Sequence, residues 1–500
     1  MVFSSLIFVY AFLPIQFLIY YLAPKEYKNA VLLFFSLIFY SWSGPLYLLL
    51  LCGDSFIAYL FALLIQKEYD AKVIRRTAKK KFLKDKYKSE KKHAKLYLTL
   101  AITILLAVLV FFKYLTWLSD CINAGLGLMS ISKIPVIKIT LPIGISFYTF
   151  QLISYVADVY TKKVEANKSY SKVLLYAGLF HQCIAGPIVR YETVAKEIED
   201  RNPNQNDVFT GIKRFSIGLA KKALLANSIA KLADTFLPTS MDTLKGQTCL
   251  GLWFGAICYT IWIYLDFSAY SDMAIGLGRI CGFHYMENFN YPYIASSVQE
   301  FWRRWHISLS TFFRDYVYIP LGGSRVKVCK HIINLLIVWV LTGLWHGASA
   351  NFALWGLYYF VFLIIEKYIF RGKKIPVIGN IYALIAVTFG WVLFRFDSFI
   401  MLKTAISGLF AFTSGNASKV KLYDIQLISS IKSNIFLLIY VVLACTPLFK
   451  WIGDVIHKET NGFTRILSNI LNLVVPAIML GLATLSLVGN SYNPFLYFRF

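Results

Sequence analysis

Long runs of apolar residues constrain the fold of this chain more than any other feature. Residues 96–118 form one such run, and it matches the roughly 20 residues that a helix needs to cross a bilayer. Charged residues make up only 15% of the chain, whereas soluble proteins average about 25%. The runs are continuous and do not alternate, which disfavours a transmembrane barrel. The sequence therefore predicts an all-α polytopic membrane protein.

The apolar segments differ in length, and several are too short or too interrupted to span a membrane. Residues 1–23 exceed the apolar core of a signal peptide and lack a basic n-region and an A-x-A site, so we expect a retained helix. Gly186 and Pro187 interrupt the segment 173–189. Short, broken segments predict re-entrant elements, which are tolerated at membrane depth only where they line a protein cavity. The segments lie at residues 1–23, 29–41, 45–65, 96–118, 139–160, 173–189, 212–236, 249–277, 331–345, 351–370, 376–396, 432–449 and 466–489.

Positive charge is concentrated in one stretch of the chain. Residues 67–95 hold 13 lysines and arginines against 4 acidic residues, within a chain of net charge +25. Nucleic-acid binding is one interpretation. We favour a cytoplasmic loop that obeys the positive-inside rule and contacts anionic lipid headgroups, with no nucleic-acid partner. This predicts a multi-pass protein of the cytoplasmic membrane, with the basic segment 278–330 also facing the cytoplasm.

The stretch EFWRRWHISLSTFFRD (300–315) is strongly amphipathic if it forms one helix. At 100° per residue it separates an apolar side from a polar side. It favours two interpretations equally: an interfacial helix with arginines on lipid phosphates, or a helix that seals the mouth of a cavity and directs His306 inward. The apolar side would carry Phe301, Trp305, Leu309 and Phe312, and the polar side Arg303, His306, Ser310 and Arg314.

His346 lies between the apolar runs 331–345 and 351–370. Fifteen helical residues rise about 22 Å, which places this histidine well inside the membrane zone. An ionisable residue at that depth indicates a functional site, although a neutral histidine bonded between packed helices remains an alternative. We expect Gly343 and Gly347 to leave room for a substrate to approach.

Two histidines in a membrane tunnel suit acyl transfer from a thioester to an alcohol. A neutral imidazole can accept the proton of a hydroxyl group and return it to a leaving group. Because a thiolate leaves readily, no serine or cysteine nucleophile is needed, and the chain has no G-x-S-x-G elbow. Neither histidine belongs to an H-x-x-x-H pair, and the eight cysteines show no paired spacing, so we expect no metal site and no disulfide.

Three carboxylates lie in apolar surroundings: Asp158, Asp266 and Asp272. Buried carboxylates must be paired or protonated. Arg303, Arg304 and Arg279 are the candidate partners. We favour structural pairing over a proton relay.

Six motifs together resemble the membrane-bound O-acyltransferases, and within them the bacterial alginate O-acetyltransferase branch. The resemblance covers nearly the whole chain, and the block 287–347 is the most specific part. The motifs are LPIGISFYTFQLISYVADVY (141–160), IAGPIVR (184–190), YLDFSAYSDMAIGLGRICGF (264–283), ENFNYPYIASSVQEFWRRWHISLSTFFRDYVYIPLGG (287–323), LTGLWHG (341–347) and NPFLYFRF (493–500).

The resemblance implies one membrane-embedded domain built as a ring of about 10–12 transmembrane helices, with short or re-entrant helices around a central tunnel. Residues 1–95 would form N-terminal helices and the basic loop, 96–370 the catalytic core, and 371–500 C-terminal helices.

The resemblance also implies the site residues. His346 corresponds to the family's main histidine and His306 to its second, so both are the expected catalytic residues. Arg303, Arg304 and Trp305 are the expected mouth for an anionic acyl donor.

Function and partners follow from the same resemblance. Acetyl-CoA or an acylated carrier protein would supply the acetyl group as a substrate, with no bound cofactor. A separate extracytoplasmic acetyltransferase or esterase-like protein would complete the O-acetylation of a cell-surface polysaccharide. D-alanyl transfer to teichoic acid is the nearest alternative, and a small-molecule transporter is an alternative of a different class.

Overall fold

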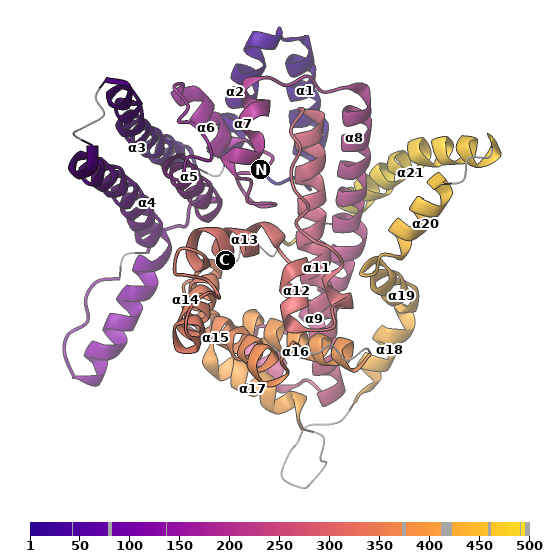
Figure 1. The fold of residues 1–500 in the computed structure, drawn as a ribbon. Helices are drawn as coiled ribbons and strands as arrows, with labels where there is room; N and C mark the ends of the chain where they lie inside the picture. The colour runs from indigo at the N-terminus through magenta and orange to yellow at the C-terminus, as the bar shows by residue number, and fades with distance from the viewer. Residues whose placement is uncertain are drawn as a thin grey trace. The chain divides into compact units, whose positions relative to one another are not determined.

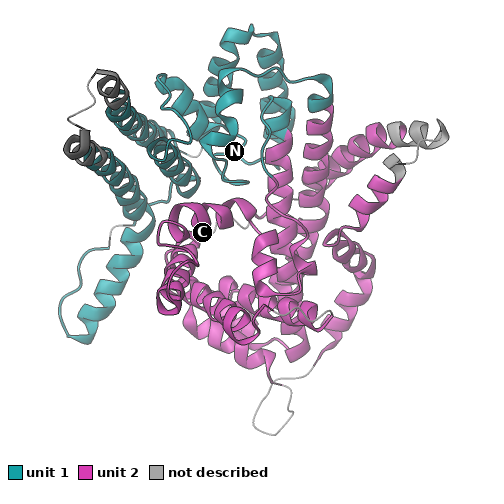
Figure 2. Ribbon diagram, in the orientation of Figure 1, with its two compact units in different colours: residues 1–208, 277–286 teal, residues 209–276, 287–500 magenta. Residues whose placement is uncertain are grey.

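The computed structural model describes the chain except residues 43, 79–82, 137, 373–376, 412–422, 459–461, 491 and 496–500, and it describes no side chains within 71–91 and 456–469. The described residues form helices, turns and extended connections, with no strand among them (Figure 1). The predicted all-α class is confirmed. The chain divides into two compact units, drawn in teal and magenta in Figure 2.

Unit 1 comprises residues 1–208 and 277–286. Besides the last turn of α11 (Cys249–Ile280), it contains seven α-helices and the first turn of an eighth within the described residues. These are α1 (Leu13–Leu22), α2 (Lys28–Ser41), α3 (Pro45–Ala78), α4 (Leu83–Leu128), α5 (Ile145–Tyr160), α6 (Tyr170–Gly178), α7 (Tyr191–Glu199) and the start of α8 (Gln205–Ala220).

Unit 2 comprises residues 209–276 and 287–500. It contains the rest of α8 and the helices that follow. These are α9 (Asn227–Phe236), α10 (Met241–Lys245), α11 (Cys249–Ile280), α12 (Val298–Arg304), α13 (Ile307–Phe313), α14 (Val328–His346), α15 (Ala350–Ile364), α16 (Ile378–Arg395), α17 (Phe399–Leu409), α18 (Ile425–Ser433), α19 (Ile435–Ala444), α20 (Leu448–Lys458) and α21 (Gly462–Val488).

Seven helices of the described part are long and apolar enough to cross a membrane, or eight if α18 and α19, which meet at 66°, form one bent span. The polytopic membrane class is therefore confirmed. The number is lower than the expected 10–12, because some apolar segments fold into pieces too short to cross. In the segment 173–189, α6 ends at Gly178 and non-helical residues continue through the predicted break at Gly186 and Pro187.

Helices α3 and α4 extend beyond their apolar segments into the basic stretch. The stretch 67–95 was expected to be a loop, but its described backbone is helical up to Ala78 and again from Leu83. Lysine, glutamate and alanine are good helix formers, which accounts for the extension. The predicted contacts of its central side chains with lipid lie outside the described residues, as do the last five residues of the closing motif.

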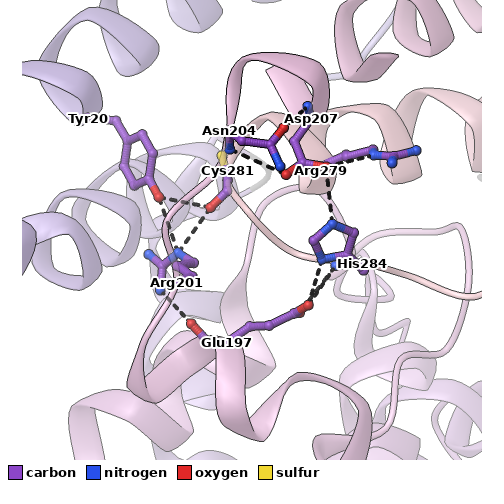
Figure 3. A network of polar contacts seen from close by, with 8 residues as sticks. All are labelled: Tyr20, Glu197, Arg201, Asn204, Asp207, Arg279, Cys281 and His284. Carbon is purple, nitrogen blue, oxygen red and sulfur yellow. Dashed lines mark hydrogen bonds and ion pairs between the residues drawn. The ribbon is translucent and has the colours of Figure 1, made fainter. Parts of the chain in front are cut away.

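A polar network in unit 1 connects the turn after α11 with α7 and the start of α8 (Figure 3). The Arg201 side chain donates to the Cys281 carbonyl at 3.0 Å and stacks on Phe283. His284 contacts carboxylates through both ring nitrogens: Nδ1 lies 2.7 Å from Glu197 and Nε2 lies 3.3 Å from Asp207. Buried backbone groups and one titratable imidazole therefore hold this turn in place.

Raising the pH should weaken this network through His284. Hydrogen bonding to Glu197, and then to Asp207, raises the pKa of His284 above its ordinary value. A raised pKa means that the charged imidazole stabilises the fold fully below about pH 6.5, and that this contribution is lost as the pH rises through the raised value. Because the side chain is 54% exposed, we expect a contribution of at most about 1 kcal/mol.

Thermal unfolding of the wild type and of His284→Gln, compared from about pH 5 to 9, measures this contribution. The difference between them should shrink as the pH rises. The same substitution at His93, which is exposed, should show no such trend. A difference that stays constant with pH would mean that the charge of His284 contributes nothing.

Helices α14 and α15 pack closely because glycines let their backbones approach. A Cβ atom on Gly343 would lie 2.2 Å from the Phe352 carbonyl oxygen, and one on Gly347 would lie 2.0 Å from the Phe352 ring. The expectation that these two glycines leave room for a substrate is wrong, since α15 fills that space. Small residues serve here for helix packing within a membrane protein.

The buried carboxylates are paired with cations, as predicted. Lys163 lies 3.3 Å from Asp158. In unit 2, Lys222 lies 2.7 Å from Asp266, and both side chains are at most 2% exposed. The partners of these two carboxylates are lysines and not the arginines suggested by the sequence.

The last carboxylate, Asp272, is paired with both Arg214 and Lys221, at 3.0 and 2.5 Å. Lys222 also donates to the carbonyl of Pro494. The start of the closing motif is thereby attached to the buried pair that Lys222 forms with Asp266.

Candidate active site

His306 lies at a break between two short helices of unit 2. The stretch 300–315 was expected to form one helix, but α12 ends at Arg304 and α13 begins at Ile307. His306 adopts a left-handed conformation with φ of 42°. Its side chain is fully buried, whereas Arg303 and Arg314 are exposed, so the predicted shared polar face does not form.

An extended segment before α12 satisfies the backbone groups that this break leaves free. The Ile307 amide donates to the Asn288 carbonyl at 3.0 Å, and the Asn290 amide donates to the Arg304 carbonyl at 2.9 Å. Buried amides and carbonyls need such partners. The left-handed residue is therefore held in place by a segment that lies far from it in sequence.

The side chain of Asn288 determines which nitrogen of His306 carries the proton. Its Oδ1 accepts hydrogen bonds from the Ser308 hydroxyl at 2.8 Å and the Ser308 amide at 3.2 Å. His306 Nδ1 lies 3.2 Å from the same oxygen and must therefore be the protonated nitrogen. Nε2 then carries the lone pair, and it has no hydrogen-bond partner among the described residues. Burial lowers the pKa of His306 to about 3, which keeps the imidazole neutral.

His346 is the last residue of α14 and lies within a group of aromatic rings. Its ring centroid is 4.9 Å from that of Trp345, 5.0 Å from Trp355 and 5.2 Å from Phe394. The Trp345 ring also contacts His306 at 5.8 Å. Two histidines forty residues apart in the chain are thus separated by one aromatic ring.

A cavity of about 1090 Å³ lies beside this site and is lined entirely by unit 2 residues. It follows α14 from His331 to Thr342, eleven residues that span roughly 16 Å. Glu366 is the only carboxylate among the described residues of the lining, and it accepts hydrogen bonds from the Val298 and Gln299 amides at 2.6 and 2.9 Å and so caps α12. The cations of the lining are Arg303, Arg314, Lys367 and Arg371.

The three residues predicted to form a donor mouth lie in three different surroundings. Arg303 lines the cavity. Arg304 instead forms an ion pair with Glu300 at 2.9 Å, and Trp305 is buried at 2% exposure against Phe301 and other aromatic rings.

Neither His306 nor His346 is among the residues that line this cavity, so a channel shared by the two histidines stays a prediction. The lining ends at Thr342, one turn before His346. Trp302 lines the cavity and contacts Trp355, which in turn contacts His346, so aromatic rings separate the space from the imidazole. Among the described residues, no three histidine, cysteine or acidic side chains are close enough together to hold a metal ion.

Sequence reasoning missed Asn288 and Trp345, although both lie inside the motif block 287–347. Trp345 directly precedes His346 and could have been proposed from that position. The role of Asn288 depends on a contact across the helix break, which has no signal in the periodicity.

Comparisons with known proteins agree with this architecture. The model of the membrane-bound O-acyltransferase family matches residues 36–405. The chain is 34% identical to the probable alginate O-acetylase AlgI of Azotobacter vinelandii, with all of both chains covered. It is 28% identical to the peptidoglycan O-acetyltransferase of Helicobacter pylori, with 100% of this chain and 98% of the relative covered. It is 27% identical to the teichoic acid D-alanyltransferase of Bacillus subtilis over 51% of this chain and 68% of that one.

Proposed function

Because the chain belongs to the membrane-bound O-acyltransferase family and is an O-acyltransferase, we propose that it acetylates an extracytoplasmic cell-surface polysaccharide from a cytoplasmic thioester. The relatives matched over their full length are named for the acetylation of alginate and peptidoglycan, which supports acetate and a polysaccharide hydroxyl. The D-alanyltransferase matches over half of this chain only. A multi-pass protein of the cytoplasmic membrane would have both substrates within reach.

His346 acts as the general base in this proposal. It takes the proton of the acceptor hydroxyl while the oxygen attacks the thioester carbonyl carbon. The carbon–sulfur bond breaks, and the departing thiolate takes the proton back from the imidazolium, which yields an ester and a thiol. His306 assists proton transfer or orients the donor, and the lone pair on its Nε2 supports this role.

The donor is acetyl-CoA or an acylated carrier protein and reaches the site from the cavity. Arg303 supports this route, because it adds positive charge to the cavity wall. Arg304 and Trp305 hold α12 in place without touching the donor. We propose that the acetyl group crosses through a tunnel that opens when the aromatic rings beside His346 move, and that a separate extracytoplasmic acetyltransferase or esterase-like protein completes delivery.

The observation that carries the proposal is the pairing of His306, a neutral imidazole whose Nε2 has no hydrogen-bond partner in the described part of the chain, with a second buried histidine one aromatic ring away. Purified protein in vesicles, supplied with acetyl-labelled CoA thioester and a polysaccharide acceptor, tests it. We expect release of free thiol and of a base-labile ester that mass analysis identifies as acetate. D-alanine in that ester would favour the teichoic acid alternative, and movement of substrate without thioester cleavage would favour a transporter.

Replacing Asn288 with leucine should slow acyl transfer without weakening donor binding. The substitution removes the acceptor that keeps the proton on His306 Nδ1, so the lone pair no longer stays on Nε2. We expect a rate loss on the order of 10- to 100-fold, as for other groups that fix the tautomer of a functional histidine. Steady-state kinetics should show the loss in kcat, with KM for the donor nearly unchanged.

A matched control is Asn290→Leu, because Asn290 contacts the same break through its backbone alone in the hydrogen bond to Arg304. We expect it to retain most of the activity. If both asparagine variants behave alike, the side chain of Asn288 has no special role.

A further inference from the structure

We propose that the end of the cavity farthest from His346 is a subsite for the phosphate of the acyl donor. The proposal rests on the function above and specifies the chemistry of its donor. It starts from His331, in the first turn of α14, which is only 2% exposed yet lines the cavity. The three residues that carry the proposal, His331, Lys367 and Arg371, are not among the site residues that the sequence predicted.

Hydrogen-bond donors outnumber acceptors around His331. Its Nε2 lies 2.8 Å from the Tyr318 hydroxyl and 3.2 Å from the Lys367 ammonium, while Nδ1 lies 2.7 Å from the Tyr368 hydroxyl. An imidazole nitrogen offers one lone pair, and an ammonium donates but never accepts. Nε2 therefore cannot satisfy both neighbours fully, and Lys367 keeps further N–H groups available for another acceptor.

The protein neutralises the positive charge of the cavity wall only in part. Across the described residues, no carboxylate lies within ion-pair distance of Lys367, Arg371 or Arg303. The fourth cation, Arg314, is already paired with Asp315 at 2.6 Å. Glu366, the one carboxylate in the described part of the wall, accepts hydrogen bonds from two amides of α12. Surplus donors and unpaired cations in a concave site favour an anion with several acceptor oxygens, and a phosphate ester has these properties.

The opposite end of the cavity suits the acyl group. Trp302 and Trp339 form its wall there, with ring centroids 4.9 Å apart, and Thr342 lies beside them. The distance of roughly 16 Å along α14 from His331 to Thr342 is comparable to an extended pantetheine arm. A donor bound lengthwise would therefore have its phosphate at Lys367 and Arg371 and its thioester near the turn that precedes His346.

The phosphate that CoA and a carrier-bound phosphopantetheine share is the group that we expect to be recognised. Full-length protein in nanodiscs can be titrated with three non-transferable thioether probes: S-acetonyl-CoA, S-acetonyl-phosphopantetheine and S-acetonyl-pantetheine. We expect both phosphate-bearing probes to bind at least about tenfold more tightly than the phosphate-free probe, as a charge-assisted contact provides. If CoA binds more tightly than phosphopantetheine, the source is CoA; if the two bind equally, the shared phosphate is sufficient.

Lys367→Met and Arg371→Met should each reduce the preference for the phosphate-bearing probes over S-acetonyl-pantetheine by about tenfold. Affinity for S-acetonyl-pantetheine should not change in either variant, which also shows that the cavity is intact. Lys403→Met is the matched control, because it removes one positive charge from an exposed site on α17 and should leave all three affinities unchanged.

Equal affinity of the wild type for all three probes would overturn the proposal. The proposal would also fail if Lys367→Met lost as much affinity for the phosphate-free probe as for the two phosphate-bearing probes. Either result would leave the proposed function intact if acetyl transfer still occurs. Conversely, a preference for phosphate without any acetyl transfer would support the subsite and refute the function.

Discussion

Replacing His346 with phenylalanine should abolish acyl transfer while the protein still inserts and folds. Phenylalanine keeps an aromatic ring against Trp345, Trp355 and Phe394, whose edge-on contacts surround the imidazole. It removes both nitrogens, and with them the proposed base. General base catalysis contributes about 10²- to 10⁴-fold to a rate, so polymer-bound acetate should fall below detection.

Alanine at the same position is a second test, because it removes the ring as well. Thermal unfolding and elution of the detergent-solubilised protein should separate loss of catalysis from loss of packing. His93→Phe, at an exposed position, should retain normal activity. Wild-type amounts of ester in His346→Phe would refute the proposed role of this histidine.

The depth of His346 in the membrane stays a prediction from chain length, because it rests only on the apolar runs on either side of the residue. The pairing of buried carboxylates could be predicted, since an isolated charge in apolar surroundings is too costly. The cation that pairs with Asp266 could not be predicted, because it depends on how the helical turn that carries Lys222 packs against α11, which lies far from it in sequence.

The helix break at His306 could not be predicted from its own segment. Helical periodicity assumes a continuous helix, and the stretch WHISLS contains neither glycine nor proline to contradict it. A left-handed non-glycine residue costs roughly 1–2 kcal/mol. The backbone and side chain of Asn288 compensate for that cost, and they come from a different part of the chain. The direction of the His306 side chain is therefore a tertiary property.

The prediction for the two glycines near His346 is wrong for a different reason. In the sequence, Gly343 and Gly347 look like free space beside a functional histidine. In the fold they bring α15 against α14, and Phe352 occupies the space. A small residue in a membrane helix indicates that another group approaches the helix closely. The sequence alone does not show whether that group is a substrate or another helix.

Lys222→Met should be the most destabilising single substitution among the ion pairs of unit 2. Lys222 and Asp266 lie 2.7 Å apart with at most 2% exposure, so the change leaves a carboxylate buried without its cation. It also removes the donor to the Pro494 carbonyl. Breaking a buried pair from one side costs about 3 to 5 kcal/mol, most of which is the penalty of the charge left behind.

The neighbouring residue provides the control for this prediction. Lys221→Met removes one of two cations from Asp272, which keeps Arg214 at 3.0 Å, so we expect a loss of only about 1 kcal/mol. The double variant Lys222→Met with Asp266→Asn should recover much of the stability, because no buried charge then remains unpaired. Unfolding in mixed micelles measures all four proteins. If Lys222→Met unfolds no more easily than Lys221→Met, the buried pair is not what holds the interior of α11 against the segment that precedes α9.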